Sequence, residues 1–127
     1  GDLRLQVRRQ KHPGGSVGVR VGDALAYVTD TVIDPATADF VRGVRLLLHE
    51  VWLTAEEAAE SDPAPTGHSD ADAVADLARG AGAGRLWIVH HHPRRSAGEL
   101  VRMAAAMQRR AGLPVEVPVE GEIYEVE

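Results

Sequence analysis

The sequence predicts a layered α/β domain whose single sheet contains strands of both directions. Short apolar runs separated by turn residues recur along the chain, which is typical of strands. Longer segments in the second half carry an apolar stripe of helical period between a capping residue and a glycine, which is typical of surface helices. The 127 residues are 44% hydrophobic, so the chain is long enough for one domain with its own core.

The first half of the chain supplies most of the predicted strands. Residues 3–9 alternate apolar and polar side chains, which predicts a half-exposed strand. The apolar runs 16–21 and 24–29 flank the turn signal at 22–23, and we expect them to form a β-hairpin. Residues 44–48 are almost continuously apolar and are predicted to form a central strand.

Helices in the second half are predicted from their ends. Hydroxyl and carboxylate side chains suited to an N-cap precede each apolar stripe, and glycines follow it. The predicted elements after residue 30 are a short helix or loop at 34–40, a helix beginning after Thr54, a helix from Ser69 to about Arg79, a strand at 86–89, a helix at 97–111, and strands at 115–119 and 123–126.

Ionisable side chains follow three of the apolar strands. Asp30 ends the hairpin, His49 and Glu50 end the central strand, and His90 follows the strand at 86–89. If these strands lie side by side, the groups converge on one edge of the sheet, where open α/β proteins hold their sites. The alternative for Asp30 is a turn cap, a common role for aspartate.

The histidines make this edge a candidate metal site, because imidazole is the commonest neutral ligand for zinc and similar ions. The chain has no cysteine, so a metal would have to take His, Asp or Glu ligands. His68 precedes a predicted helix, whose dipole disfavours its charged form; the alternative is an ordinary loop histidine. His91 and His92 could face the site or pack, and Arg94 and Arg95 could attract a phosphate or remain solvent-exposed charges.

Charge and hydropathy exclude some classes of protein. A net charge of −5 argues against a general nucleic-acid-binding or membrane-surface module. No apolar run approaches the ~18 residues that a membrane span needs, no signal peptide is visible, and we expect a cytoplasmic protein. Because the first residue is Gly rather than Met, we expect that the chain does not begin at a native start; the alternatives are a processed piece, a tagged protein and an excised half.

Four motifs in order resemble the second half of the metallo-β-lactamase fold, in its ribonuclease Z-like and phosphodiesterase-type branch. The preceding segment 12–20 is also similar to the strand before the first motif. The motifs are Ala26-Tyr27-Val28-Thr29-Asp30-Thr31, Leu46-Leu47-Leu48-His49-Glu50, Gly67-His68-Ser69 and Arg85-Leu86-Trp87-Ile88-Val89-His90-His91-His92-Pro93. The resemblance implies an αββα sandwich, of which this chain would form the C-terminal half: a mixed sheet with helices on one face.

The resemblance also implies roles for individual residues. Asp30 matches an aspartate that bridges two metal ions, and His90 matches a histidine that binds one of them. His68 matches a histidine that protonates the leaving group together with a glutamate, here Glu50. The ions would be two divalent metals, with Zn²⁺ expected and Mn²⁺ or Fe as alternatives, and they would activate a water molecule. Val51, Trp52 and Asp70 depart from the ribonuclease Z motifs, which favours a broader class of bacterial metal-dependent hydrolases over tRNA 3′-processing.

The superfamily motif His-x-His-x-Asp-His is absent from the sequence. We therefore expect residues 1–127 to be one domain excised from a longer enzyme, inactive alone, with the missing N-terminal half as its partner. The expected substrate is a phosphodiester, as a small molecule, nucleotide or RNA end, and a homodimer is possible. The rival interpretations are a non-catalytic scaffold that binds a partner and incidental metal capture by the histidine triplet.

Overall fold

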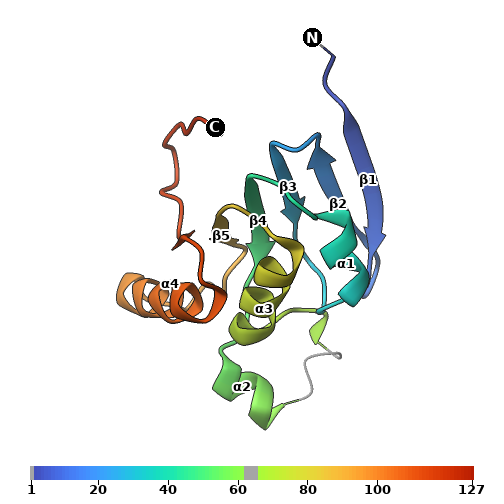
Figure 1. Cartoon of the computed structure of the whole chain (residues 1–127). Helices are drawn as coiled ribbons and strands as arrows, with labels where there is room; N and C mark the ends of the chain where they lie inside the picture. Colours follow the sequence, from blue (N-terminus) through green and yellow to red (C-terminus); the bar gives the residue numbers. More distant parts are fainter. Residues whose placement is uncertain (1, 62–65) are drawn as a thin grey trace.

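The computed structural model describes residues 2–61 and 66–127 and contains one six-stranded mixed sheet. The strands lie in chain order across it: β1 (Leu5–Gln10), β2 (Ser16–Val21), β3 (Leu25–Val28), β4 (Leu46–Glu50), β5 (Leu86–Val89) and β6 (Val115–Glu116). The first three are antiparallel neighbours, and β3 to β6 run parallel (Figure 1). The predicted α/β class with mixed strand directions is confirmed.

In the described part of the chain, four helices connect the parallel strands: α1 (Pro35–Phe40), α2 (Ala55–Glu60), α3 (Ala71–Ala81) and α4 (Ala97–Ala111). Figure 1 shows α1 and α3 over one face of the sheet. Their ends follow the predicted caps. The side chains of Thr54, Asp70 and Ser96 accept backbone N–H groups in the first turns of α2, α3 and α4, and α3 and α4 end at glycines with left-handed backbone. These bonds satisfy N–H and C=O groups that a helix end leaves unpaired.

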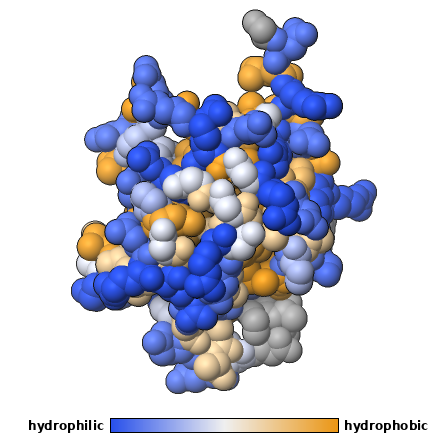
Figure 2. Space-filling view, in the orientation of Figure 1, coloured by the Kyte–Doolittle hydropathy of each residue, from blue (hydrophilic) through white to orange (hydrophobic). Residues whose placement is uncertain are grey.

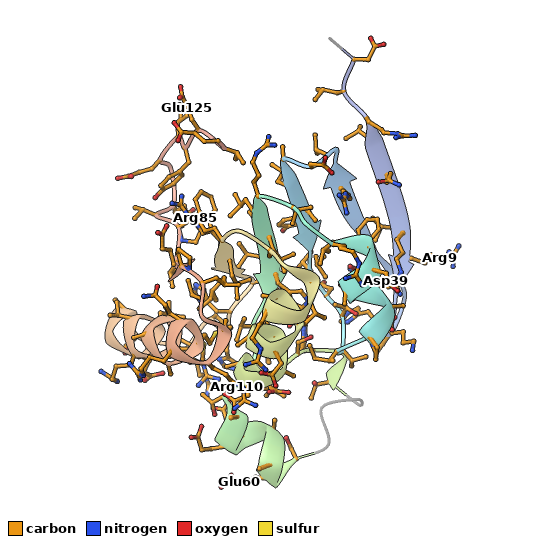
Figure 3. The ribbon with its side chains drawn as sticks, viewed as in Figure 1. Arg9, Asp39, Glu60, Arg85, Arg110 and Glu125 are labelled. Atoms are coloured by element: carbon orange, nitrogen blue, oxygen red, sulfur yellow. The ribbon has the colours of Figure 1, made fainter. Side chains whose placement is uncertain are left out.

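The core lies between the helices and one face of the sheet. Apolar side chains of α3 and α4 pack there against the strands, and the largest contributors are Leu47, Leu86, Ile88, Val74, Met103 and Met107. Ion pairs tie the helix layer together: Arg110 of α4, labelled in Figure 3, donates to Asp72 and Asp76 of α3. On the outside of this layer charged and polar residues predominate (Figure 2).

The opposite face of the sheet carries apolar side chains and no helix among the described residues. Leu5, Val7, Val17 and Tyr27 share this face by register and are 62%, 65%, 50% and 40% exposed. The open face of β1–β3 is therefore accessible to solvent, whereas Ala26 and Val28 on the other face of β3 belong to the core. An apolar surface of this kind marks an interaction site in soluble proteins.

Three predicted strands differ from the structure. The central strand spans 46–50 rather than 44–48, so His49 and Glu50 belong to the hydrogen-bonded ladder itself. The last predicted strand, 123–126, is wrong, and β6 contains only two residues of the predicted run 115–119. Pro118 has no N–H to continue the pairing, and Tyr124 packs edge-on against Trp87 instead. Among the described residues, no helix is both long and apolar enough to cross a bilayer.

Candidate active site

The carboxyl ends of β3, β4 and β5 meet at one edge of the sheet, at the lower edge in Figure 1 for β3 and β4. Because these strands are parallel neighbours, the residues that follow them lie close together. The Asp30 carboxylate and the His90 ring nitrogen Nδ1 are 3.2 Å apart, although 60 positions separate the two residues in the sequence. The Asp30 side chain is 39% exposed and the His90 side chain is 38% exposed. The structure thus brings together the two residues predicted to bind metal.

The backbone at both positions is left-handed. Asp30 has φ 51° and His90 has φ 46°, and within residues 2–61 and 66–127 no other non-glycine residue has a positive φ. This conformation costs a non-glycine residue about 1–3 kcal/mol and persists only where the surroundings impose it. Strain of this kind concentrates at functional sites, and here it coincides with the two predicted metal ligands.

Four side chains from other parts of the chain hold the segment 29–31. Gln10 donates to the carbonyl of Thr29 at 2.5 Å, and Ser16 donates to the carbonyl of Asp30 at 2.6 Å. On the other side of Asp30, the Glu50 carboxylate accepts the N–H of Thr31, and Ser69 donates to the Thr31 carbonyl. Four side-chain hydrogen bonds therefore fix the peptide groups around Asp30.

Glu50 is fully buried and holds His68. Its Oε1 accepts the His68 Nδ1–H at 2.9 Å and the N–H of Thr31 at 2.7 Å, and its Oε2 accepts the N–H of Ser69 at 3.1 Å. Burial raises the pKa of Glu50, and the hydrogen bonds from His68 and the two backbone groups oppose that rise. Because Nδ1 of His68 is engaged, its Nε2 is the ring nitrogen left for a ligand or substrate.

Glu50, His68 and His90 offer ligand atoms within 4.8 Å of one another, a spacing that could hold a metal ion. Glu50, however, already accepts three N–H groups, so its oxygens are the least available of the set. Asp30 and His90 are partly exposed, hard and borderline donors of the kind that divalent zinc, manganese and iron take. The donor set therefore fits a divalent metal at Asp30 and His90, with Glu50 bound to His68 rather than to the ion.

The side chain of His49 does not reach this edge. It faces the helices, is fully buried, and has Nδ1 against the carbonyl of Glu50. Burial lowers the pKa of His49 to about 4, so the ring is neutral at neutral pH. His49 is a core residue, and only its neighbour Glu50 contacts the site.

Trp52 is a site residue that the sequence pattern did not reveal. Its indole stacks on His68 with ring centroids 4.4 Å apart and an interplanar angle of 13°, and it stacks on His90 at 5.2 Å. His92 meets it edge-on at 4.9 Å. The only signal in the sequence was the position of Trp52 two residues after Glu50, where it departs from the ribonuclease Z pattern.

Other residues near the edge have partners that were not predicted. Arg95 pairs with Glu57 through two nitrogens, at 2.8 and 2.5 Å, and also donates to the carbonyl of Trp52, so it is a structural link between α2 and the site. This pairing lowers the pKa of Glu57 to about 2. Arg94 remains exposed. His12, expected only in a turn, places Nδ1 2.8 Å from the carbonyl of Gly67 and its ring 5.3 Å from that of His68.

The sequence relatives of this chain are ribonucleases. It is 36% identical over 89 residues to a ribonuclease BN of Cronobacter sakazakii, which covers 70% of this chain and 29% of that protein. It is 35% identical over 79 residues to a ribonuclease Z of Thermoplasma volcanium, covering 62% and 25%. The chain thus spans about a quarter of the length of these relatives. No family model matches the chain.

The fold is that of solved metallo-β-lactamase proteins. The metallo-β-lactamase fold protein YhfI of Bacillus subtilis aligns with a TM-score of 0.82 at 20% identity, over 98% of this chain and 50% of its own. A diphosphatase of the PhnP family aligns with a TM-score of 0.66 at 19% identity, over 94% and 42%. The resemblance of the four motifs is confirmed by these findings, and the chain is a ribonuclease Z-like member of the metallo-β-lactamase superfamily.

Proposed function

We propose that this chain carries part of the active site of a metal-dependent phosphodiester hydrolase. The observation that carries the proposal is the meeting of two residue pairs at one sheet edge. Asp30 and His90 form a partly exposed pair of metal donors 3.2 Å apart, and the Glu50–His68 pair lies beside them, with the His68 and His90 rings 5.4 Å apart.

Each pair has a separate task in the proposed reaction. Asp30 offers two carboxylate oxygens and His90 one imidazole nitrogen to the metals. Two divalent ions, Zn²⁺ or alternatively Mn²⁺ or Fe, would supply an activated water as the nucleophile when bound. His68 donates a proton from Nε2 to the departing oxygen, and Glu50 holds the ring through Nδ1 so that Nε2 faces the reaction.

The open apolar face of the sheet supports a second part of the proposal. Residues such as Val7 and Tyr27 would be covered by the other half of the fold, which would carry the His-x-His-x-Asp-His motif and the remaining metal ligands. The B. subtilis protein YhfI is about twice as long as the segment that aligns with this chain, which is consistent with such a half. The alternative occupant of the face is a second copy of this chain.

The proposed substrate is a phosphodiester, and RNA ends are included. The relatives with sequence similarity are ribonucleases, and one of the solved structures with this fold is a diphosphatase. Val51, Trp52 and Asp70 differ from the ribonuclease Z motifs, so we propose a broader specificity than tRNA 3′-processing.

Metal titration of single variants tests the assignment of the metal donors. Calorimetric titration with Zn²⁺ of the protein that contains both halves of the fold should show binding that Asp30→Ala and His90→Ala each weaken at least about 10-fold. His68→Ala should retain the metal. His91→Ala is the matched control, because it removes a neighbouring imidazole and should leave the affinity unchanged.

Hydrolysis is measured on the protein that contains both halves of the fold, with bis(p-nitrophenyl) phosphate as substrate. There His68→Ala should lower kcat about 100-fold or more, as expected for loss of a general acid. A wild-type protein that contains both halves and binds no Zn²⁺ would support the non-catalytic scaffold instead. Binding that is lost in His91→Ala and kept in Asp30→Ala would point to incidental capture by the triplet.

A further inference from the structure

Trp52 contacts several histidines of the candidate site, and none of the roles assigned above accounts for these contacts. Its ring stacks on the proposed proton donor His68 and on the proposed metal ligand His90, and the edge of His92 meets it as well. No ribonuclease Z motif supplies a tryptophan at this position in the resemblance described above. The indole is therefore a feature of this chain and not of the shared motif.

The geometry places His68 and His90 on the same side of the indole. Stacked aromatic rings lie about 4.5 Å or more apart, so imidazoles on opposite faces of one ring would be separated by about 9 Å. The two centroids are only 5.4 Å apart, with an angle of 34° between the rings. Trp52 thus forms one continuous wall behind both imidazoles.

The backbone of Trp52 is fixed on both sides. Its N–H donates to the carbonyl of Ser69 at 3.1 Å, next to His68 in the chain. Its carbonyl accepts from Arg95 at 2.9 Å, and Arg95 is itself held by Glu57. The wall is therefore attached to the segment that carries His68 and to the loop that follows His90.

The indole face fixes the orientation of the imidazole planes, which the hydrogen bonds alone leave free. Glu50 holds His68 through a single ring nitrogen, which leaves the ring able to rotate about that bond. Stacking on the indole at an angle of 13° fixes the plane of the imidazole, and with it the direction of Nε2. His90 is partly exposed, and its left-handed backbone alone does not set its ring plane.

We propose that Trp52 is a positioning residue that sets the ring planes of His68 and His90, so that the proton donor and the metal ligand face the same point. This inference rests on the proposed function for the roles of the two histidines. It concerns how they are oriented, and the wall itself is independent of whether a metal binds.

Imidazole NMR spectra of the metal-free chain test the wall directly. The indole shifts the ring protons of His68 upfield and shields its Nδ1–H from exchange. Trp52→Leu should abolish the upfield shifts and speed exchange of the Nδ1–H at least about 10-fold, and Trp52→Phe should restore both in large part because it retains an aromatic face. Trp87→Phe is the matched control: that indole packs on Tyr124 and donates to Glu116, away from the histidines.

A Zn²⁺ titration of the same variants gives the second readout. Trp52→Leu should weaken binding about 10-fold, as for loss of a residue that orients ligands, and Trp52→Phe should stay close to wild type. In Trp87→Phe the remaining fluorescence comes from Trp52 and should change on Zn²⁺ addition. Unchanged His68 and His90 ring signals in Trp52→Leu would overturn the positioning role. Absence of Zn²⁺ binding by the wild-type protein that contains both halves of the fold would instead contradict the proposed function, while the metal-free spectra still decide the role of the wall.

Discussion

The two residue pairs of the candidate site are built in opposite ways. Asp30 and His90 are partly exposed, sit on left-handed backbone and contact each other. Glu50 is fully buried, extends an ordinary strand, and with His68 forms a pair whose acceptor oxygens are saturated by three N–H groups. The difference indicates that the two proposed metal donors lie accessible on strained backbone, whereas the proposed proton donor is held by burial and hydrogen bonds.

The largest expected effect falls on the buried pair. Glu50→Ala would leave the backbone N–H groups of Thr31 and Ser69 and the ring of His68 without their acceptor, so the free energy of unfolding should drop by about 3–5 kcal/mol. Urea denaturation monitored by circular dichroism measures it. Asp30→Ala should change stability by under about 1 kcal/mol; equal losses in the two variants would contradict the contrast between the pairs.

The next effect concerns pH and the neighbour of Glu50. The pKa of His49 is lowered from 6.5 to about 4 by burial, so the unfolded chain binds a proton that the folded chain rejects. Stability is therefore complete above about pH 6.5 and falls as the pH drops toward 4, by on the order of 3 kcal/mol. Urea denaturation between pH 7 and 4 should show this slope in wild type and lose it in His49→Gln.

A smaller effect is expected at the support of the strained pair. Ser16→Ala removes the hydroxyl that donates to the Asp30 carbonyl, which should lower the free energy of unfolding by about 1–2 kcal/mol. It should also weaken Zn²⁺ binding, because Asp30 loses one of its fixed neighbours. Ser16→Thr keeps the hydroxyl and should retain more of both; a Ser16→Ala variant with wild-type affinity would show that Ser16 does not position Asp30.

The smallest effect has the opposite sign. Glycine adopts left-handed backbone without the steric cost, so His90→Gly should raise the free energy of unfolding by about 0.5–1 kcal/mol while removing a metal donor. His91→Gly is the matched control, since His91 does not have a positive φ, and it should lower stability by a similar amount. Thermal unfolding of both variants is sensitive enough to separate them.

Most of the strands and the site edge could be predicted, because they depend on local patterns. The hairpin, the strand at 86–89 and the capped helices follow from alternation and cap chemistry, and parallel pairing brings Asp30 and His90 together. The resemblance of the motifs also predicted that Glu50 and His68 lie together. Their roles in metal binding and proton transfer stay predictions.

What could not be predicted depends on contacts between distant segments. The pairing of Arg95 with Glu57 joins residues 38 positions apart and removes a cation from the supposed phosphate site. The stacking of Trp52 depends on the path of the loop after β4. No strand forms at 123–126, where Tyr124 packs edge-on against Trp87 of β5. Neither the left-handed backbone nor the hydrogen bonds from Gln10 and Ser16 leave a mark in the local sequence.

The left-handed backbone at Asp30 and His90 also determines which substitutions would accumulate at these positions if the site lost its function. If the proposed metal role were lost, glycine at either position would relieve the backbone strain, and only the contacts of the lost side chain would oppose that change. Only selection for ligand chemistry would therefore maintain aspartate and histidine at these two positions, because substitution by glycine would favour a more stable but inactive protein.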